Sequence, residues 1–598
     1  MDSARNQKGK SLLRLARAGC TDSIVAHLAG LFVLIGGGGL LGLAMGRAGP
    51  AHQWIPPWDT AALLAAGWRI RNGQIPHTDY FSYHDLHGWI TALGLWLTHD
   101  SVRALTIGAL LVAGVSGVWG WIVASRRLST FGTLLFVGMT MLVATGVVPE
   151  GTSHYARNTS YAMQYNRFGL ALLNVLALQL MFRPLRPDGR IGGHLRAISA
   201  GILLALLLSA KINFFLGGMA LLIGSGILFG RCFLSLPTTA LAFFGTWGFA
   251  WIFLGLRLDH YLSDVQAISG FESALTSATR VMGMALHNVE WFLLLFVLFL
   301  IGWGGAGALS AGRRVSSREI RLFLAAFWAG CVGCLVVAAN SQGEGPLVGG
   351  LNMGGRYVPL FAVAALMIGD GQRRLFLALD PQRQRVHLFR QLLSLGLTGY
   401  FVVRIFIFPD LSGILYALHW QHTKAPLQPA AARIPTSTLE TMLLPKINDE
   451  VDTPREVLDH ILFGDVTPFR FAILHTDGIR LLEKHVTADS RILALAESNL
   501  FPLALHLPPP RGGTYWFTFT RQAKKLVGKD RLSAMDRLLD DATLLMEPKF
   551  RDDFTLRLRR LYGTDIARLF EKVDESPLWT LYRRKSADRV TREELAPP

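Results

Sequence analysis

The sequence predicts an α-helical polytopic membrane protein that ends in an α/β domain outside the membrane. The chain has 598 residues, of which 51% are hydrophobic and only 17% are charged, whereas about 25% of residues are charged in a typical soluble domain. Apolar stretches long enough to cross a bilayer recur along the first two-thirds of the chain. After residue 410 the apolar runs shorten and the charge rises. We therefore expect a membrane region over 24–410 and an extracytoplasmic domain over 411–598.

About eleven stretches satisfy the length and hydrophobicity of a membrane span. They lie near 24–46, 101–125, 129–148, 167–182, 197–210, 212–230, 233–256, 288–310, 321–339, 357–370 and 389–408. The 197–230 region and the short 357–370 stretch also fit broken or tilted helices. A basic tail over 1–23 precedes the first span.

The distribution of Lys and Arg predicts the orientation. Given these spans, every basic cluster falls on the side of the N-terminus, which the positive-inside rule makes cytoplasmic. The clusters contain Arg5, Lys8, Lys10, Arg14, Arg17, Arg126, Arg127, Arg183, Arg186, Arg190, Arg196, Arg231, Arg313, Arg314, Arg318, Arg321, Arg373, Arg374, Arg383 and Arg385. The first outer loop, 47–100, and everything after 410 then face outward. The net charge of +17 serves topology and contact with anionic lipid, so we expect no nucleic-acid partner.

Residues 411–598 have the alternating strand and helix patterns of a small α/β domain. We expect strands over 470–476 and 491–497 with a helix over 477–486 between them, which would form a βαβ unit. Further strands are expected over 543–550 and 578–584. Apolar residues at helical spacing predict a helix over 554–569 between those two strands. The turn-rich loop "LPPPRGG", 507–513, favours a surface loop over a contact with substrate.

The first outer loop holds an unusual polar segment between two apolar helices. Pro56 and Pro57 end the first span, and Asp59 opens an Ala/Leu-rich helix that ends at Asn72–Gly73. This helix is too short to span and should lie on the outer membrane interface. "HTDYFSYHDLHG", 77–88, then packs two aspartates, three histidines and two tyrosines into one segment before a second amphipathic stretch. By itself, Asp59 also fits an ordinary N-cap.

This arrangement resembles the first outer loop of the GT-C glycosyltransferases. The resemblance rests on a span, an acidic residue opening an interfacial helix, "NG-x-x-P-x-x-D-Y-F", and a His-Gly before the next helix. It implies transfer of a sugar from a polyprenyl-phosphate donor to a glycolipid, polysaccharide or protein on the outer face of a bacterial cytoplasmic (inner) membrane. Where many members have Asp-Glu, this chain has Asp59–Thr60. The base role therefore belongs to Asp59 alone or to Asp59 with Asp79.

An inverting transferase needs a carboxylate to deprotonate the acceptor hydroxyl and cations to stabilise the phosphate that leaves. We assign Asp59 as the base and Asp79 to orienting the acceptor or the sugar. Lys211 interrupts two apolar stretches, where a lysine is either functional or snorkels to the interface. The other candidate binding residues are Asp85, His84, His87, Glu150, Arg157, Arg167 and Arg356. A divalent cation held by Asp59, Asp79 or His84 stays open, since no spacing is diagnostic.

Two other classes of membrane protein compete with this interpretation. An O-antigen ligase or another transferase acting on lipid carriers would carry its main site in a large loop late in the chain, whereas the densest acidic cluster here follows the first span. A transporter or flippase would show repeated halves with polar residues at the midplane. No internal repeat is present. The glycosyltransferase is therefore the favoured class.

Overall fold

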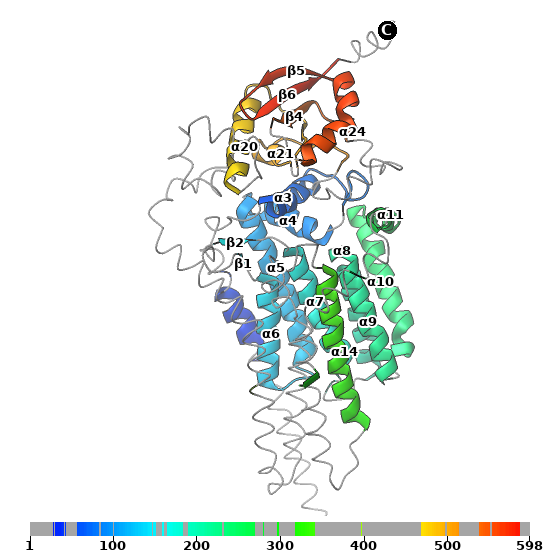
Figure 1. The fold of residues 1–598 in the computed structure, drawn as a ribbon. Helices are drawn as coiled ribbons and strands as arrows, with labels where there is room; N and C mark the ends of the chain where they lie inside the picture. The colour runs from blue at the N-terminus through cyan, green and yellow to red at the C-terminus, as the bar shows by residue number, and fades with distance from the viewer. Residues whose placement is uncertain are drawn as a thin grey trace, which may run out of the picture.

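The computed structural model describes a helical bundle with a small sheet above one end (Figure 1). The described residues are 57–82, 85–99, 101–145, 148–150, 158–160, 164–182, 189–229, 232–269, 317–340, 468–496, 499–513, 538–549 and 553–586, with much of 28–42 and a few isolated positions. The spans expected at 288–310, 357–370 and 389–408 lie almost entirely outside this set.

Seven long helices form the described part of the bundle. They are α5 (Ser101–Ala124), α6 (Thr130–Thr145), α7 (Gln164–Met181), α8 (Arg190–Ala210), α9 (Ile212–Phe229), α10 (Cys232–Leu254) and α14 (Ser317–Asn340). Each overlaps a span that the sequence predicts. Four segments are long and apolar enough to cross a membrane: Arg103–Ala124, Arg190–Ala210, Ile212–Phe229 and Leu236–Leu254. Of the first expected span, 24–46, the structure describes a short π-helical segment, η1 (Val33–Gly37), and its surroundings.

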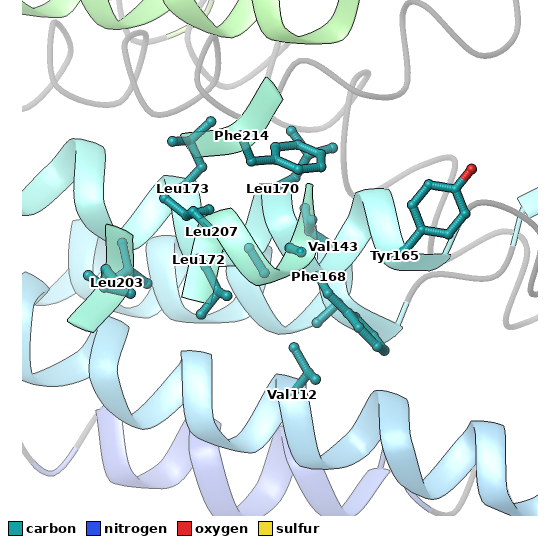
Figure 2. Close-up of a cluster of buried hydrophobic side chains, with 14 of the residues drawn as sticks. Val112, Val143, Tyr165, Phe168, Leu170, Leu172, Leu173, Leu203, Leu207 and Phe214 are labelled. Carbon is teal, nitrogen blue, oxygen red and sulfur yellow. The ribbon is translucent and has the colours of Figure 1, made fainter. Parts of the chain in front are cut away.

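Helix α7 lies at the centre of the bundle. All but one of its side chains are buried, including the polar ones of Gln164, Asn166, Arg167, Asn174 and Gln179. Figure 2 shows Phe168, Leu172 and Leu173 of this helix among residues of α5, α6, α8 and α9. By contrast, α5, α9 and α10 expose large apolar side chains such as Ile122, Ile227 and Phe249. Exposed apolar faces of this kind suit contact with lipid, so the chain is a polytopic helical membrane protein.

The chain reverses direction at Lys211, between α8 and α9. The backbone of Lys211 is extended, with φ −176° and ψ 142°. A Cβ at Gly218 of α9 would lie 2.8 Å from the side chain of Leu204 in α8, so the two helices pack side by side after the turn. The stretch that the sequence left open as a broken helix is therefore a tight helical hairpin with Lys211 at its tip.

Three shorter helices gather at the end of the bundle that faces the sheet, which we call the loop end (Figure 1). They are α3 (Pro57–Arg71), α4 (Asp85–Thr98) and α11 (Leu258–Ser269). Helices α3 and α4 are antiparallel, because Gly67 meets Thr91 while Gly88 meets Ile70. Residues 61–70 are all buried within the protein, so α3 packs against other segments of the chain, and its expected position at the membrane interface stays a prediction. Its Ala- and Gly-rich faces let other segments approach on every side.

The C-terminal sheet has four strands in the order β3-β4-β6-β5. They are β3 (Ile492–Ala494), β4 (Leu544–Pro548), β5 (Phe570–Glu575) and β6 (Trp579–Arg584). Strands β3 and β4 are parallel and the other pairs are antiparallel. Helices α20 (Pro468–Leu482) and α21 (Phe501–Ala504) supply residues to the core on one face of the sheet, and α24 (Asp553–Leu569) supplies residues to the core on the other.

Two expectations for this region are wrong. Residues 470–476 belong to α20 and not to a strand, so the expected βαβ unit does not form. Leu474, Gly478 and Leu481 are buried at helical spacing, and a short apolar run cannot distinguish the two structures. Strand β5 was not expected, because its sequence FEKVDE is mostly charged. It is an edge strand, where charged side chains reach solvent. The segments 491–497, 543–550, 578–584 and 554–569 do contain β3, β4, β6 and α24.

Candidate functional site at the loop end of the bundle

A buried imidazole joins two carboxylates at the loop end. His77 Nε2 lies 2.6 Å from Asp85 Oδ2, and His77 Nδ1 lies 2.7 Å from Asp264 Oδ2. The Ser82 hydroxyl donates to the other oxygen of Asp85 at 2.7 Å. These residues come from the α3–α4 loop, the first turn of α4 and α11. The network therefore fastens the loop to two helices.

Burial and the neighbouring carboxylates shift the pKa of His77 in opposite directions. Burial lowers the pKa of His77, but the carboxylates of Asp85 and Asp264 outweigh it and raise that pKa from 6.5 to about 9. Burial raises the pKa of Asp264, and its bond to His77 counters part of that rise. At neutral pH His77 is thus an imidazolium that donates from both nitrogens. Its φ of 65° is uncommon for a residue with a side chain, and such strain clusters at functional sites.

Sequence reasoning missed His77 and Asp264 as site residues. The two lie 187 positions apart, and α11 had not been expected as an element. The only local signal was the polar segment 77–88, in which His84 and His87 had been preferred over His77. Asp85, expected as a binding residue, is buried and holds His77.

Asp79 lies in the same loop and is more accessible. Its Oδ2 accepts from the Ile75 amide at 2.8 Å, and its Oδ1 lies 3.9 Å from Arg511 Nε. Its side chain is 19% exposed, so a substrate hydroxyl can reach it.

The loop 507–513, which we call the docking loop, lies on α3 and on the segment that carries Asp79. The sequence favoured a surface loop, and this prediction is wrong for most of the segment, because the backbone of the docking loop binds the first outer loop. Gly512 donates its amide to Asp79 O at 2.6 Å, and Phe81 donates to Gly513 O at 2.8 Å. Side chains of the first outer loop donate to three more carbonyls, Trp68 to Leu507 at 2.8 Å, Gln74 to Pro509 at 2.8 Å and Arg69 to Pro510 at 2.9 Å.

Asp59 lies in the first turn of α3, at the end opposite Asp79. Ten residues of continuous helix separate it from Arg69, which places their Cα atoms about 15 Å apart. Arg69 in turn contacts Gly512, whose amide binds Asp79. The two aspartates that the sequence proposes as partners therefore do not lie side by side along the helix.

Two expected cations lie near the loop end, Lys211 at the tip of the α8–α9 hairpin and Arg167 in the first turn of α7. Lys211 Nζ lies 5.5 Å from the ring centroid of Tyr165, a cation–π contact. Arg167, two residues along α7, donates to Val143 O at 3.4 Å. Both side chains are buried. Tyr261 of α11 donates to Leu208 O at 2.7 Å and packs against the His77 ring, which links this region to the carboxylate network.

His87 and Gln164 supply uncharged polar groups beside these cations. The His87 ring stacks on Phe168 at a centroid distance of 5.0 Å. Burial lowers the pKa of His87 to about 3, so its imidazole is neutral. Gln164 opens α7 and is buried one turn before Phe168.

The remaining candidates are placed only in part. Glu150 lies in β1 (Val148–Glu150), where it pairs with Asn158 of β2 (Asn158–Ser160). His84, Arg157 and Arg356 lie outside the described residues. Within the part of the chain that the structure describes, no three His, Cys, Asp or Glu side chains are arranged to hold a metal ion.

No protein-family model matches the sequence, and no curated protein matches it. Among solved structures, the chain is similar to ArnT from Cupriavidus metallidurans bound to undecaprenyl phosphate, with 11% identity, a TM-score of 0.43, and coverage of 93% of this chain and 98% of that one. The apo state of the same protein gives 12% identity, a TM-score of 0.42, and coverage of 92% and 97%. The Archaeoglobus fulgidus oligosaccharyltransferase tethered to an acceptor peptide gives 9% identity, a TM-score of 0.35, and coverage of 93% and 74%. All three TM-scores are below 0.5, so these similarities do not by themselves define a fold.

Proposed function

We propose that this chain is a membrane glycosyltransferase of the GT-C type, which moves a sugar from a polyprenyl-phosphate donor to an acceptor at the membrane surface. One observation carries the proposal. The loop end carries a partly exposed carboxylate, Asp79, and two buried cations, Lys211 and Arg167. A carboxylate and a pair of cations at a membrane boundary suit a reaction in which a hydroxyl is deprotonated and a lipid phosphate leaves.

In the proposed reaction the acceptor oxygen attacks the anomeric carbon of the donor sugar. Its proton passes to a carboxylate, a new C–O bond forms, and the bond between the anomeric carbon and the phosphate oxygen breaks. The electron pair of that bond stays on the phosphate, so inversion at the carbon yields the glycoside and the polyprenyl phosphate. Lys211 and Arg167 stabilise the phosphate charge, because donors held in a dry site need no reorganisation.

The base is proposed to be Asp59, with Asp79 orienting the acceptor or the donor sugar. Because Asp59 lies in the first turn of α3 and Asp79 lies beyond the other end of that helix, they serve different parts of the substrates. Asp85 acts through His77 to hold the loop. Glu150, Arg157, His84 and Arg356 are further candidates for the substrate, and a divalent cation is an open part of the proposal.

The proposal includes an orientation. The loop end and the C-terminal domain face the outside of a bacterial cytoplasmic membrane, and the N-terminus faces the cytoplasm. A ligase or another transferase on lipid carriers, or a transporter, are the competing classes. None has a specific observation in its favour at this end of the bundle.

Turnover of lipid-linked sugars tests the proposal. The purified protein is incubated with an acceptor extract and a panel of undecaprenyl-phosphate sugars, and release of undecaprenyl phosphate is measured. Lys211→Ala should lower turnover at least about a hundredfold, and Lys211→Arg should retain part of it, because the charge survives while the donor geometry changes.

Arg190→Ala is the matched control, since Arg190 is an exposed cation at the opposite end of the same helix. It should leave turnover within about twofold, as is usual for an exposed residue away from a site. Full activity of folded Lys211→Ala would remove the lysine from the site. No turnover of any panel member by the wild-type protein would contradict the proposed function.

A further inference from the structure

Two buried polar side chains, His87 of α4 and Gln164 at the start of α7, have no hydrogen-bond partner among the described residues. His87 is 2% exposed and Gln164 is 1% exposed. Both ring nitrogens of His87 and both amide atoms of Gln164 lack a bond in the structure as described. More than nine-tenths of buried polar groups are normally paired, and an unpaired one costs about 1–3 kcal/mol. Four such atoms in one small region therefore need an explanation.

The two side chains both neighbour the same aromatic residue, Phe168. His87 of α4 stacks on Phe168 with the two ring planes 15° apart. Gln164 precedes Phe168 by four residues, which puts their side chains on the same face of α7, about 5–6 Å apart at Cβ. The unpaired atoms thus belong to one region and not to two unrelated positions.

The chemistry of this pair suits hydroxyl groups and not a phosphate. A neutral imidazole offers one donor and one acceptor, and an amide offers two donors and one acceptor. A sugar hydroxyl is itself both a donor and an acceptor, so it can satisfy either side chain. A phosphate only accepts, and it would leave the acceptor atoms of His87 and Gln164 unpaired.

The position of Gln164 on α7 indicates that these hydroxyls belong to the donor sugar. Tyr165, which follows Gln164 in the same turn of α7, forms the cation–π contact with Lys211, and Arg167 lies in that turn as well. If Lys211 and Arg167 hold the donor phosphate, the sugar bonded directly to that phosphate lies within one turn of helix. We propose that His87 and Gln164 are the specificity-determining pair that hydrogen-bonds the hydroxyls of the donor sugar. This inference rests on the proposed function.

Apolar replacements of similar shape test the assignment. His87→Phe keeps the stack on Phe168, and Gln164→Leu keeps the volume of the side chain. Because each removes buried unpaired groups, the midpoint of thermal unfolding in detergent should stay the same or rise. Affinity for the undecaprenyl-phosphate sugar that the wild-type enzyme turns over fastest should fall at least about tenfold. Affinity for undecaprenyl phosphate without a sugar should stay within about twofold.

Asn174→Leu is the matched control. Asn174 also lies on α7, is completely buried, and has no hydrogen-bond partner for its amide within the described chain. It is ten residues from Gln164, about 15 Å along the helix. This variant should leave both affinities unchanged.

Each of the other outcomes contradicts either the assignment of His87 and Gln164 or the proposed function. Unchanged affinity for the lipid-linked sugar in both variants would mean that the unpaired atoms bind ordered water, and the assignment fails while turnover persists. Equal loss of both affinities would place the pair on the phosphate, and an effect confined to the KM of the acceptor would place it on the acceptor. If the wild-type protein binds undecaprenyl phosphate no more tightly than Lys211→Ala does, the proposed function fails and not this assignment alone.

Discussion

Asp59 and Asp79 can be separated experimentally because their structural roles differ. Asp59 is the third residue of α3 and not its N-cap. Asp59→Asn keeps a side chain of the same shape at this position but removes the proton acceptor. A general base contributes about 10²–10⁴-fold, so turnover should fall at least about a hundredfold at unchanged expression. Asp79→Asn retains the acceptor for the Ile75 amide and should mainly raise KM.

A different pattern in these two variants would reassign the roles. If Asp59→Asn stays active while Asp79→Asn is inactive, Asp79 is the base. If both variants stay active, the transferase interpretation of this loop is wrong. The measurement is release of undecaprenyl phosphate at saturating and at limiting acceptor concentrations.

His77 should make stability depend on pH. Its pKa is raised from 6.5 to about 9, so its contribution is fully present below pH 6.5 and is lost as the pH rises through 9. The shift corresponds to about 3 kcal/mol. The midpoint of thermal unfolding in detergent should therefore fall between pH 6.5 and pH 9.5 in the wild-type protein, and this fall should be smaller in His77→Asn.

His99→Asn is the control for this measurement. His99 has a φ of 53° and is exposed, so the substitution tests the same backbone conformation without the two carboxylates. Asn tolerates a positive φ better than most residues, which limits the strain in both variants. A wild-type midpoint that does not change across this pH range would show that His77 is not held as an imidazolium.

At the scale of elements, the docking loop and α3 form one structural unit. Arg69 contributes two bonds to this contact, because its guanidinium donates to Pro510 O and Gly512 O, and it also lies 5.0 Å from the centre of the Tyr80 ring. Burial lowers the pKa of Arg69 to about 10, so it stays charged at neutral pH. Gly512 and Gly513 have φ values of 82° and 66°, which permit the turn that brings the loop's carbonyls to α3.

Arg69→Leu should release the docking loop from the first outer loop. The variant leaves two carbonyls without their donor, which costs about 1–3 kcal/mol each when they stay buried. Hydrogen exchange at the amides of Gly512 and Phe81, which bond across this contact, should accelerate at least about tenfold. Arg71→Leu is the control, since Arg71 bonds to Leu95 O and not to the docking loop. Equal protection in the two variants would contradict the role of Arg69.

These elements also show what sequence can predict. The end of α3 followed from a local signal, Asn72–Gly73, because helix breakers act within a few residues. Its start was expected at Asp59 and lies two residues earlier, at Pro57. The docking of 507–513 on α3 could not be read, since the contacts join positions more than 430 apart. The His77–Asp264 contact has the same cause. Residues 470–476 were misassigned because their burial is set by the sheet beneath them and not by their own pattern.

At the scale of the whole molecule, three helices carry basic residues at the end away from the sheet. Arg126, Arg190 and Arg321 lie at the ends of α5, α8 and α14 that point away from α3 and the C-terminal sheet (Figure 1). Arg127 needs a separate account, because its guanidinium donates to Val123 O and Phe182 O and ties the ends of α5 and α7 together. Arg126, Arg190 and Arg321 have no such bonds among the described residues, so membrane topology best explains their position.

This distribution predicts that the C-terminal sheet lies outside the cytoplasm. Leu500 and Leu503 belong to the same apolar cluster as the bundle, and the docking loop is bonded to α3, so the sheet cannot lie on the opposite face from the loop end. A reporter that is active only in the cytoplasm, fused after Pro598, should therefore be silent, and the same reporter fused within the 183–190 connection should be active. A periplasm-specific reporter at the two sites should give the reverse pattern. Cytoplasmic activity after Pro598 would invert the orientation, and it would place the carboxylates and cations of the loop end on the face where nucleotide-linked sugars are present instead of the face proposed here.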